Sequence, residues 1–161
     1  MTQDSDKIAA ALSIAKGIIA PFEGFCGEPY QDVAGIWTYG YGFITESSGC
    51  RVTETTCAID ETDAKCRLEA IVSKTLNAVA GMVYVPLTTN QIAALTSFAY
   101  NVGTGALRTS HTVLAPLNAG EYQVAADGLM QWVFCSGVRV QGLANRRAAE
   151  RALFLTPDEG S

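Results

Sequence analysis

Three side chains with the chemistry needed for hydrolysis lie close together near the N-terminus. Glu23 and Asp32 are nine residues apart, and Thr38 follows six residues later. Cleavage of a glycosidic bond needs one carboxylic acid that protonates the leaving oxygen. It also needs an ionised carboxylate that readies a water or attacks the sugar. These residue types make Glu23 a candidate proton donor, Asp32 a candidate base and Thr38 a candidate holder of the water.

The same three residues also have a purely structural interpretation. Asp and Thr are common at turns and at strand ends, and a Glu often ends in solvent. Two carboxylates at this spacing are weak evidence by themselves. Both interpretations therefore stay open on spacing alone.

The surrounding sequence places Glu23 at a helix end and the other two side chains in a small sheet. Apolar residues recur at helical spacing over 6–19, and the chain is expected to break or tighten at Pro21, with Glu23 just past the helix or in its last turn. The negative end of a helix dipole disfavours a second negative charge, which suits a general acid. Between 28 and 44, β-forming residues surround a turn at 34–35 and predict short strands.

The rest of the chain is predicted to be helical after one more strand around 51–53. Asp60 is a suitable N-cap for a long helix towards Gly81, and Thr88 with Gln91 forms a capping box for the next helix, which should end near Gly103. Shorter helices are expected over 110–118, 121–134 and 143–155.

These elements predict an α+β fold that is mostly α, with a small β-rich lobe near the N-terminus and a helical remainder. We expect one domain over 1–155 and a frayed tail over 156–161. The long helix is expected to join the two lobes and to back the cleft between them.

Composition indicates a packed globular protein and argues against two kinds of partner. The 161 residues are 48% hydrophobic and 17% charged. The formal charge of −5 argues against nucleic acid, whose phosphates favour a basic surface. The most apolar stretch, 8–22, contains Lys16 and is shorter than the roughly 20 residues of a spanning helix, so no stable membrane insertion is expected.

The five cysteines are odd in number and many for this length. Cys50 and Cys57 bracket a polar loop, so a local disulfide is one interpretation. Burial of most thiols as small apolar side chains is the other. No spacing of Cys and His matches a zinc site, and no metal or organic cofactor is expected.

Three segments resemble the phage-type lysozymes, glycoside hydrolase family 24, which includes many bacteriophage endolysins. Residues 22–42 read FEGFCGEPYQDVAGIWTYGYG and resemble the catalytic segment of that family. Residues 87–105 read LTTNQIAALTSFAYNVGTG, and 142–155 read GLANRRAAERALFL; both are similar to later family segments. The resemblance covers about residues 8–155, and the combination is specific.

The resemblance implies a lysozyme-like fold of two lobes flanking a cleft, and it assigns roles to the three candidates. Glu23 becomes the acid, Asp32 positions or activates water, and Thr38 completes the triad. An arginine of the closing helix, placed at Arg146, lies close to the acid in family members. On residue type alone, Arg146 could equally be a salt-bridge or helix-end residue.

Tyr30, Tyr41 and Asn101 are weaker candidates for contacts with the substrate. Flat rings suit pyranose faces, but aromatic residues that alternate along a short strand are more often core, which is the interpretation we favour for Trp37. Asn101 could hydrogen-bond an N-acetyl group or cap a helix.

Two departures from the family pattern change what is expected. Phe43 stands where family members often carry His, which removes a polar group near the rim of the cleft. No signal-anchor, which some relatives carry for export, is recognised. We therefore expect the protein to stay in the host cytoplasm until a holin-type membrane lesion releases it, and then to act in the periplasm and cell wall.

The sequence thus predicts a monomeric muramidase that hydrolyses the β-1,4 bond between N-acetylmuramic acid and N-acetylglucosamine in peptidoglycan and lyses the host cell. Direct displacement by water with inversion is expected, because Thr38 suits a water holder. Carboxyl groups more than ~6 Å apart would support inversion, and ~5 Å would favour a covalent intermediate at Asp32. The alternatives are a lytic transglycosylase, against which Asp32 and Thr38 argue, and an inactive wall-binding protein, against which the intact triad argues.

The acidic charge contrasts with many basic relatives and predicts weak electrostatic attachment to an anionic wall. Clearing of wall suspensions should then change little between low and moderate salt, since there is little attraction for salt to screen. Turbidity decay at two ionic strengths measures this. A steep loss of rate on adding salt would contradict it.

Overall fold

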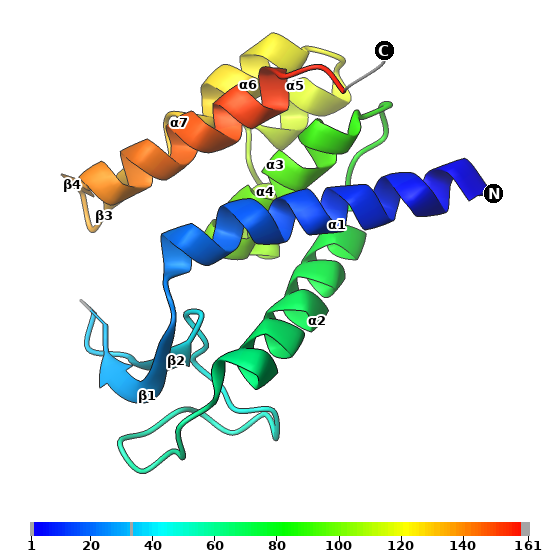
Figure 1. The fold of residues 1–161 in the computed structure, drawn as a ribbon. Helices are drawn as coiled ribbons and strands as arrows, with labels where there is room; N and C mark the ends of the chain where they lie inside the picture. Colours follow the sequence, from blue (N-terminus) through cyan, green and yellow to red (C-terminus); the bar gives the residue numbers. More distant parts are fainter. Residues whose placement is uncertain (1, 33, 159–161) are drawn as a thin grey trace. The chain divides into compact units, whose positions relative to one another are not determined.

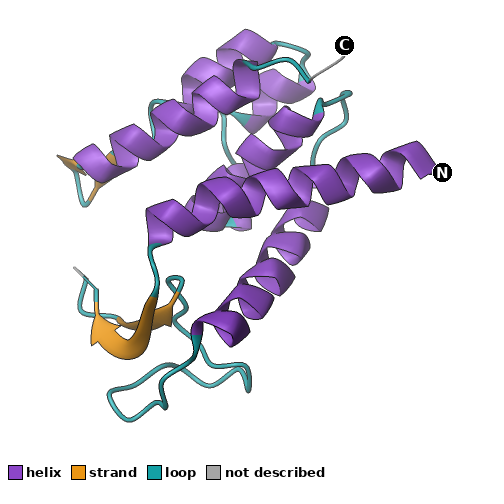
Figure 2. Cartoon of the chain, viewed as in Figure 1, coloured by secondary structure: helices purple, strands orange, loops and turns teal. Residues whose placement is uncertain are grey.

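The computed structural model describes residues 2–32 and 34–158. Helices dominate these ranges, and the named strands are confined to two short hairpins (Figure 1, Figure 2). The predicted α+β, mostly helical fold class is confirmed. Within the same ranges, no helix combines the length and the apolar character needed to cross a bilayer.

The chain divides into two compact units. The hairpin unit comprises residues 16–71, and the helical unit joins the residues up to 15 with those from 72 onward. Helices α1 (Thr2–Glu23) and α2 (Glu61–Ala80) each contribute residues to both units. Asp60 Oδ1 accepts a hydrogen bond from the Asp63 N–H at 2.9 Å, which confirms the predicted N-cap of α2.

Helix α1 runs through Pro21, so the chain does not break there, which was one of the two predicted outcomes. Only two residues of the helix follow Pro21, and a proline removes a single N–H from the hydrogen-bond ladder. The helix ends where the Gly24 N–H donates to the Ala20 carbonyl at 2.9 Å, with Gly24 at φ 69°. Glu23 is therefore the last residue of α1, one of the two positions predicted for it.

The hairpin unit contains an antiparallel pair, β1 (Cys26–Gln31) and β2 (Trp37–Gly40). Tyr30 pairs with Thr38, and the register shifts between residues 26 and 30. The strand expected around 51–53 is reduced to an isolated bridge between Thr45 and Arg51. The polar residues that follow make local hydrogen bonds with one another, which compete with strand pairing.

Arg67 of α2 ties the helix to the aromatic residues of the hairpin unit. Its Nη1 donates to the Tyr39 hydroxyl at 2.7 Å, and its Nη2 donates to the Thr45 carbonyl. The guanidinium carbon lies 4.6 Å from the centroid of the Phe43 ring. A cation over an aromatic face is attractive, so Phe43 serves packing at the position where the family often carries His.

The helical unit is built around α3, whose residues 92–99 are all buried. The predicted capping box of Thr88 and Gln91 is present at its start, and α3 packs against α7. The helices of this unit after α2 are α3 (Thr89–Val102), α4 (Thr104–Arg108), α5 (Leu114–Asn118), α6 (Tyr122–Leu129) and α7 (Gln141–Leu155).

A second hairpin replaces the end of the helix that was expected over 121–134. Helix α6 stops at Leu129, and β3 (Phe134–Cys135) pairs with β4 (Val138–Arg139). Ser136 and Gly137 both have positive φ, at 49° and 79°, as a tight two-residue hairpin turn requires. Ser-Gly is a weaker turn signal than Asn-Gly, so the sequence pattern did not predict this hairpin.

The chain just beyond α7 is hydrogen-bonded to the start of α3 through residues 156–158, the first part of the tail that was expected to fray. The Asp158 carboxylate accepts the backbone N–H groups of Thr89 and Asn90 at 2.8 and 3.1 Å. Asn90 Nδ2 donates to the carbonyls of Thr156 and Pro157. Residues 159–161 lie outside the described residues. Asp158 thus satisfies two N–H groups that the first turn of α3 leaves without partners inside the helix.

The pKa of Asp158 predicts a stability effect that depends on pH. Burial acts to raise this pKa, but the hydrogen bonds from Thr89 and Asn90 dominate and lower it below the ordinary 3.8. A carboxylate with a lowered folded-state pKa stabilises the protein above the unfolded-state value and loses that effect as pH falls.

Asp158→Asn should therefore lower the free energy of unfolding by about 1 kcal/mol at neutral pH, and the difference should shrink as the pH falls below the ordinary carboxyl pKa of 3.8. Urea unfolding at neutral pH and at a pH below that value measures this. Asp6→Asn, a change at an exposed residue, is the matched control and should have little effect at either pH. Equal destabilisation by both variants would contradict the anchoring role.

Candidate active site

The Glu23 carboxyl group lies directly against the backbone at Gly42. A Cβ atom built on Gly42 would lie 2.7 Å from Glu23 Oε2, closer than real Cβ contacts allow. Gly42 also has φ 80°, in the region that favours glycine. The positive φ therefore favours glycine, and any larger residue at this position would require the Glu23 carboxylate to move.

Asp32 directly follows β1 and is held by the turn that it forms. Its Oδ1 accepts the N–H groups of Ala34 and Ile36 at 2.8 and 2.9 Å. Among the described residues, its other oxygen, Oδ2, has no hydrogen bond in the structure. The turn interpretation of Asp32 is thus correct for one oxygen, while the second oxygen can serve another purpose.

Thr38 is buried in β2, and its hydroxyl has one defined partner. The O–H donates to the Ile36 carbonyl at 3.0 Å, in the same turn that holds Asp32. Because the single hydroxyl proton is used there, Thr38 Oγ1 can only accept further hydrogen bonds.

Tyr30 links the three candidates. It pairs across the strands with Thr38, so the two side chains share one face of the hairpin. Its pKa is raised, first by burial and then by the negative charges of Cys26, Glu23 and Asp32. Both candidate carboxylates therefore act on the same phenol group, and Glu23, Asp32, Thr38 and Tyr30 gather in one region of the hairpin unit.

Tyr41 does not belong to this group. Its ring is only 5% exposed and packs against Phe25 and Phe43, with centroids 5.5 and 6.5 Å away. Its hydroxyl donates to Glu61 at 3.3 Å, and burial together with the Glu61 charge raises its pKa. A buried ring leaves no face for a sugar, so the assignment of Tyr41 to substrate contact is corrected to core packing.

Arg146 and Asn101 belong to the helical unit. Arg146 is buried; its Nε donates to Glu150 Oε1 at 3.2 Å and its Nη2 to the Ser97 carbonyl at 3.3 Å. Asn101 accepts a hydrogen bond from Arg147 Nη2 at 3.0 Å. Asn101 therefore helps to hold a buried guanidinium, while the nearness of Arg146 to the acid stays a prediction.

Glu150 is a buried charged residue that was not among the candidates predicted from the sequence. It is fully buried, and its Oε1 accepts a hydrogen bond from the Ser97 hydroxyl at 2.7 Å. Its Oε2 lies 2.8 Å from Arg147 Nε in an ion pair, but these two atoms are not aligned for a hydrogen bond. Burial raises the pKa of Glu150 and lowers that of Arg147 to about 10. The spacing of Glu150 three and four residues after the two arginines is the helical signal that could have revealed the cluster.

The cysteines fit neither predicted interpretation. All five are free, so Cys50 and Cys57 form no disulfide. Four of them are exposed, and only Cys26 is partly buried, so burial as apolar side chains was also wrong.

Comparison with known proteins relates this geometry to a family. The sequence profile of the family described as "Phage lysozyme" matches residues 20–150. The endolysin of Bacillus phage B103 is 39% identical over 142 residues, which cover 86% of this chain and 51% of that protein. The chain thus spans about half the length of that relative. The SAR-endolysin of Bacteriophage PS119 is 35% identical over 92% of this chain and 85% of its own length.

A solved structure extends the similarity to the fold. The endolysin from Escherichia coli O157:H7 phage FAHEc1 superposes with a TM-score of 0.77 at 33% identity, covering 93% of this chain and 94% of that one. The matched range contains the hairpin with Glu23, Asp32 and Thr38 as well as most of the closing helix. The chain belongs to the phage lysozyme family and is a muramidase-type hydrolase with a lysozyme-like α+β fold.

Proposed function

We propose that this protein is an endolysin that hydrolyses the β-1,4 bond between N-acetylmuramic acid and N-acetylglucosamine, with Glu23, Asp32 and Thr38 as its catalytic residues. The observation that carries the proposal is that Tyr30 is the strand partner of Thr38 and is close enough to Glu23 and Asp32 for both carboxylate charges to raise its pKa. A general acid, a base and a hydroxyl gathered in one region are the groups that this hydrolysis needs.

Glu23 is the proton donor in this mechanism. Its carboxyl group is partly exposed at the end of α1 and pressed against Gly42, so its position is restricted while a substrate can reach it. It gives its proton to the glycosidic oxygen as the bond from that oxygen to the anomeric carbon breaks.

Asp32 and Thr38 together orient the attacking water. Thr38 Oγ1 and Asp32 Oδ2 can both accept, since the Thr38 proton and the Asp32 Oδ1 are occupied within the turn. A water that donates one proton to each has its lone pairs directed away from them, towards the sugar. As the water oxygen bonds to the anomeric carbon, Asp32 takes up the proton, which gives inversion.

Tyr30 and Arg146 have supporting roles in this proposal. Tyr30 is more than one-third exposed, so its ring and hydroxyl can contact the sugar. The buried cluster on α7 has a combined formal charge of +1, from Arg146, Arg147 and Glu150. This charge suits a neighbouring anion. The family resemblance assigns Arg146 to the neighbourhood of the acid, and a guanidinium with that role would stabilise the carboxylate that remains after the acid has given up its proton.

The biological setting that we propose is lysis of a bacterial host by a phage or prophage. Relatives named endolysin and SAR-endolysin support action on the wall. For this chain we propose release from the host cytoplasm through a holin-type lesion, with the monomer then acting in the periplasm and cell wall.

Glu23→Gln should reduce lysis of chloroform-treated cells at least about 100-fold, because the amide cannot deliver the proton. The unfolding temperature should be nearly unchanged. Glu28→Gln removes the same charge from an exposed residue of β1 and serves as the matched control. Mass spectrometry of the wild-type products should show the added water; anhydro-sugar ends would identify a transglycosylase. Near-normal lysis by Glu23→Gln would remove Glu23 from the role of acid.

Gly42→Ala should lower activity by about tenfold or more, because the added methyl group displaces the Glu23 carboxylate. The positive φ also costs about 1–2 kcal/mol of stability. Gly49→Ala is the control, since Gly49 has φ 88° but no atom within 4 Å of a built Cβ. It should show the backbone cost and retain activity. Equal loss of activity in both variants would argue against a positioning role for Gly42.

A further inference from the structure

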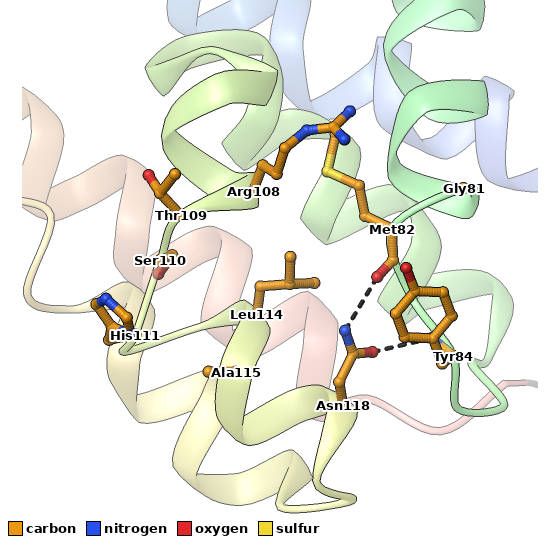
Figure 3. A pocket seen from close by; sticks show the side chains of 10 residues that line it. All are labelled: Gly81, Met82, Tyr84, Arg108, Thr109, Ser110, His111, Leu114, Ala115 and Asn118. Carbon is orange, nitrogen blue, oxygen red and sulfur yellow. Dashed lines mark hydrogen bonds between the residues drawn. The ribbon is translucent and has the colours of Figure 1, made fainter.

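A second concave site lies in the helical unit and contains none of the candidate catalytic residues. It encloses about 320 Å³ between the end of α2, the segment after α4, and α5. Met82, Leu114 and Ala115 give it an apolar lining (Figure 3). A volume of this order accommodates a small ligand or a short stretch of peptide.

Two basic side chains line this pocket without a partner. Arg108 and His111 are exposed, and neither makes a hydrogen bond or ion pair with any described residue of the structure. The residues that line the pocket include no Asp or Glu. In a chain with a formal charge of −5, this makes the pocket a local positive site suited to an anion.

The opposite wall carries an exposed aromatic ring on a fixed segment. Tyr84 is 83% exposed, the highest value among the large hydrophobic side chains of the described residues. Asn118 Oδ1 accepts the Tyr84 N–H at 2.9 Å, and its Nδ2 donates to the Met82 carbonyl at 3.0 Å (Figure 3). The segment that bears Tyr84 is therefore held in place before any ligand arrives, which reduces the entropy cost of binding.

We propose that this pocket binds the carboxylate end of a short peptide with small apolar side chains, the chemistry of the stem peptides of peptidoglycan. Arg108 has a planar guanidinium that can bind a carboxylate with two parallel hydrogen bonds. Methyl groups of the peptide pack against Leu114 and Ala115, and Tyr84 covers the bound chain. The proposal rests on the proposed function for the source of the ligand, but not on the catalytic residues.

Such a site gives an acidic enzyme a specific hold on an anionic wall. Attachment through overall charge is weak when protein and wall are both negative. A pocket that recognises one carboxylate together with its apolar neighbours avoids this limit, because it acts at contact distance.

The single histidine of the chain makes binding directly measurable. The probe is diacetyl-L-lysyl-D-alanyl-D-alanine, whose only charge is its terminal carboxylate. Titration with this peptide should shift the two ring C–H signals of His111 in the NMR spectrum along a saturable curve. Titration with the C-terminal amide of the same peptide should not shift them. Arg108→Gln should weaken binding about tenfold, as expected for loss of a charge-assisted contact, and Tyr84→Ala should weaken it several-fold.

Arg51→Gln makes the same charge change at an exposed residue of the hairpin unit and should leave binding unchanged. Unchanged affinity in Arg108→Gln, equal binding of the amide, or no saturable shift would overturn the proposal. Inorganic phosphate that competes as strongly as the peptide would replace it with a general anion site.

Failure here can be distinguished from failure of the proposed function. The probe has no glycosidic bond, so its affinity should be the same in the wild type and in Glu23→Gln. Peptide binding together with full activity of Glu23→Gln would leave the pocket intact and refute the catalytic assignment. Loss of activity in Glu23→Gln without any peptide binding would support the catalytic assignment and refute the peptide pocket.

Discussion

The contact between the Glu23 carboxyl group and the backbone at Gly42 is the constraint on which the candidate active site depends. It brings the end of α1 close to the segment that follows β2, so the carboxyl group lies where a helix terminus approaches the hairpin. A side chain at position 42 would occupy the space of the carboxylate. The glycine therefore matters because it allows a close approach in a backbone conformation that other residues adopt at a cost.

A guanidinium group organises each of the two units. In the hairpin unit, Arg67 lies over the Phe43 ring and donates to Tyr39 and Thr45, so one side chain joins α2 to the loops after the sheet. In the helical unit, two arginines and Glu150 of α7 meet the buried face of α3. Removing one partner from such a buried group costs about 3–5 kcal/mol, because the remaining charge loses its compensation.

The turn between β1 and β2 serves structure and chemistry with the same atoms. Asp32 closes the turn through one carboxylate oxygen, and Thr38 donates its only hydroxyl proton to the turn carbonyl of Ile36. Both residues are then left with acceptor atoms only. The structural and the functional interpretations of these residues are therefore compatible: the turn that uses half of their hydrogen-bonding capacity also orients the other half.

The sequence by itself determined the fold class, the caps of α2 and α3, the position of Glu23 at a helix end, and the family, because local periodicity, capping chemistry and motif spacing are properties of short segments. Only the tertiary structure decided which side chains meet. In the structure, Tyr41 is a buried core residue and Asn101 accepts a hydrogen bond from the buried Arg147. Glu150 is buried and accepts a hydrogen bond from Ser97. These outcomes depend on contacts between residues far apart in the chain, which no local pattern encodes.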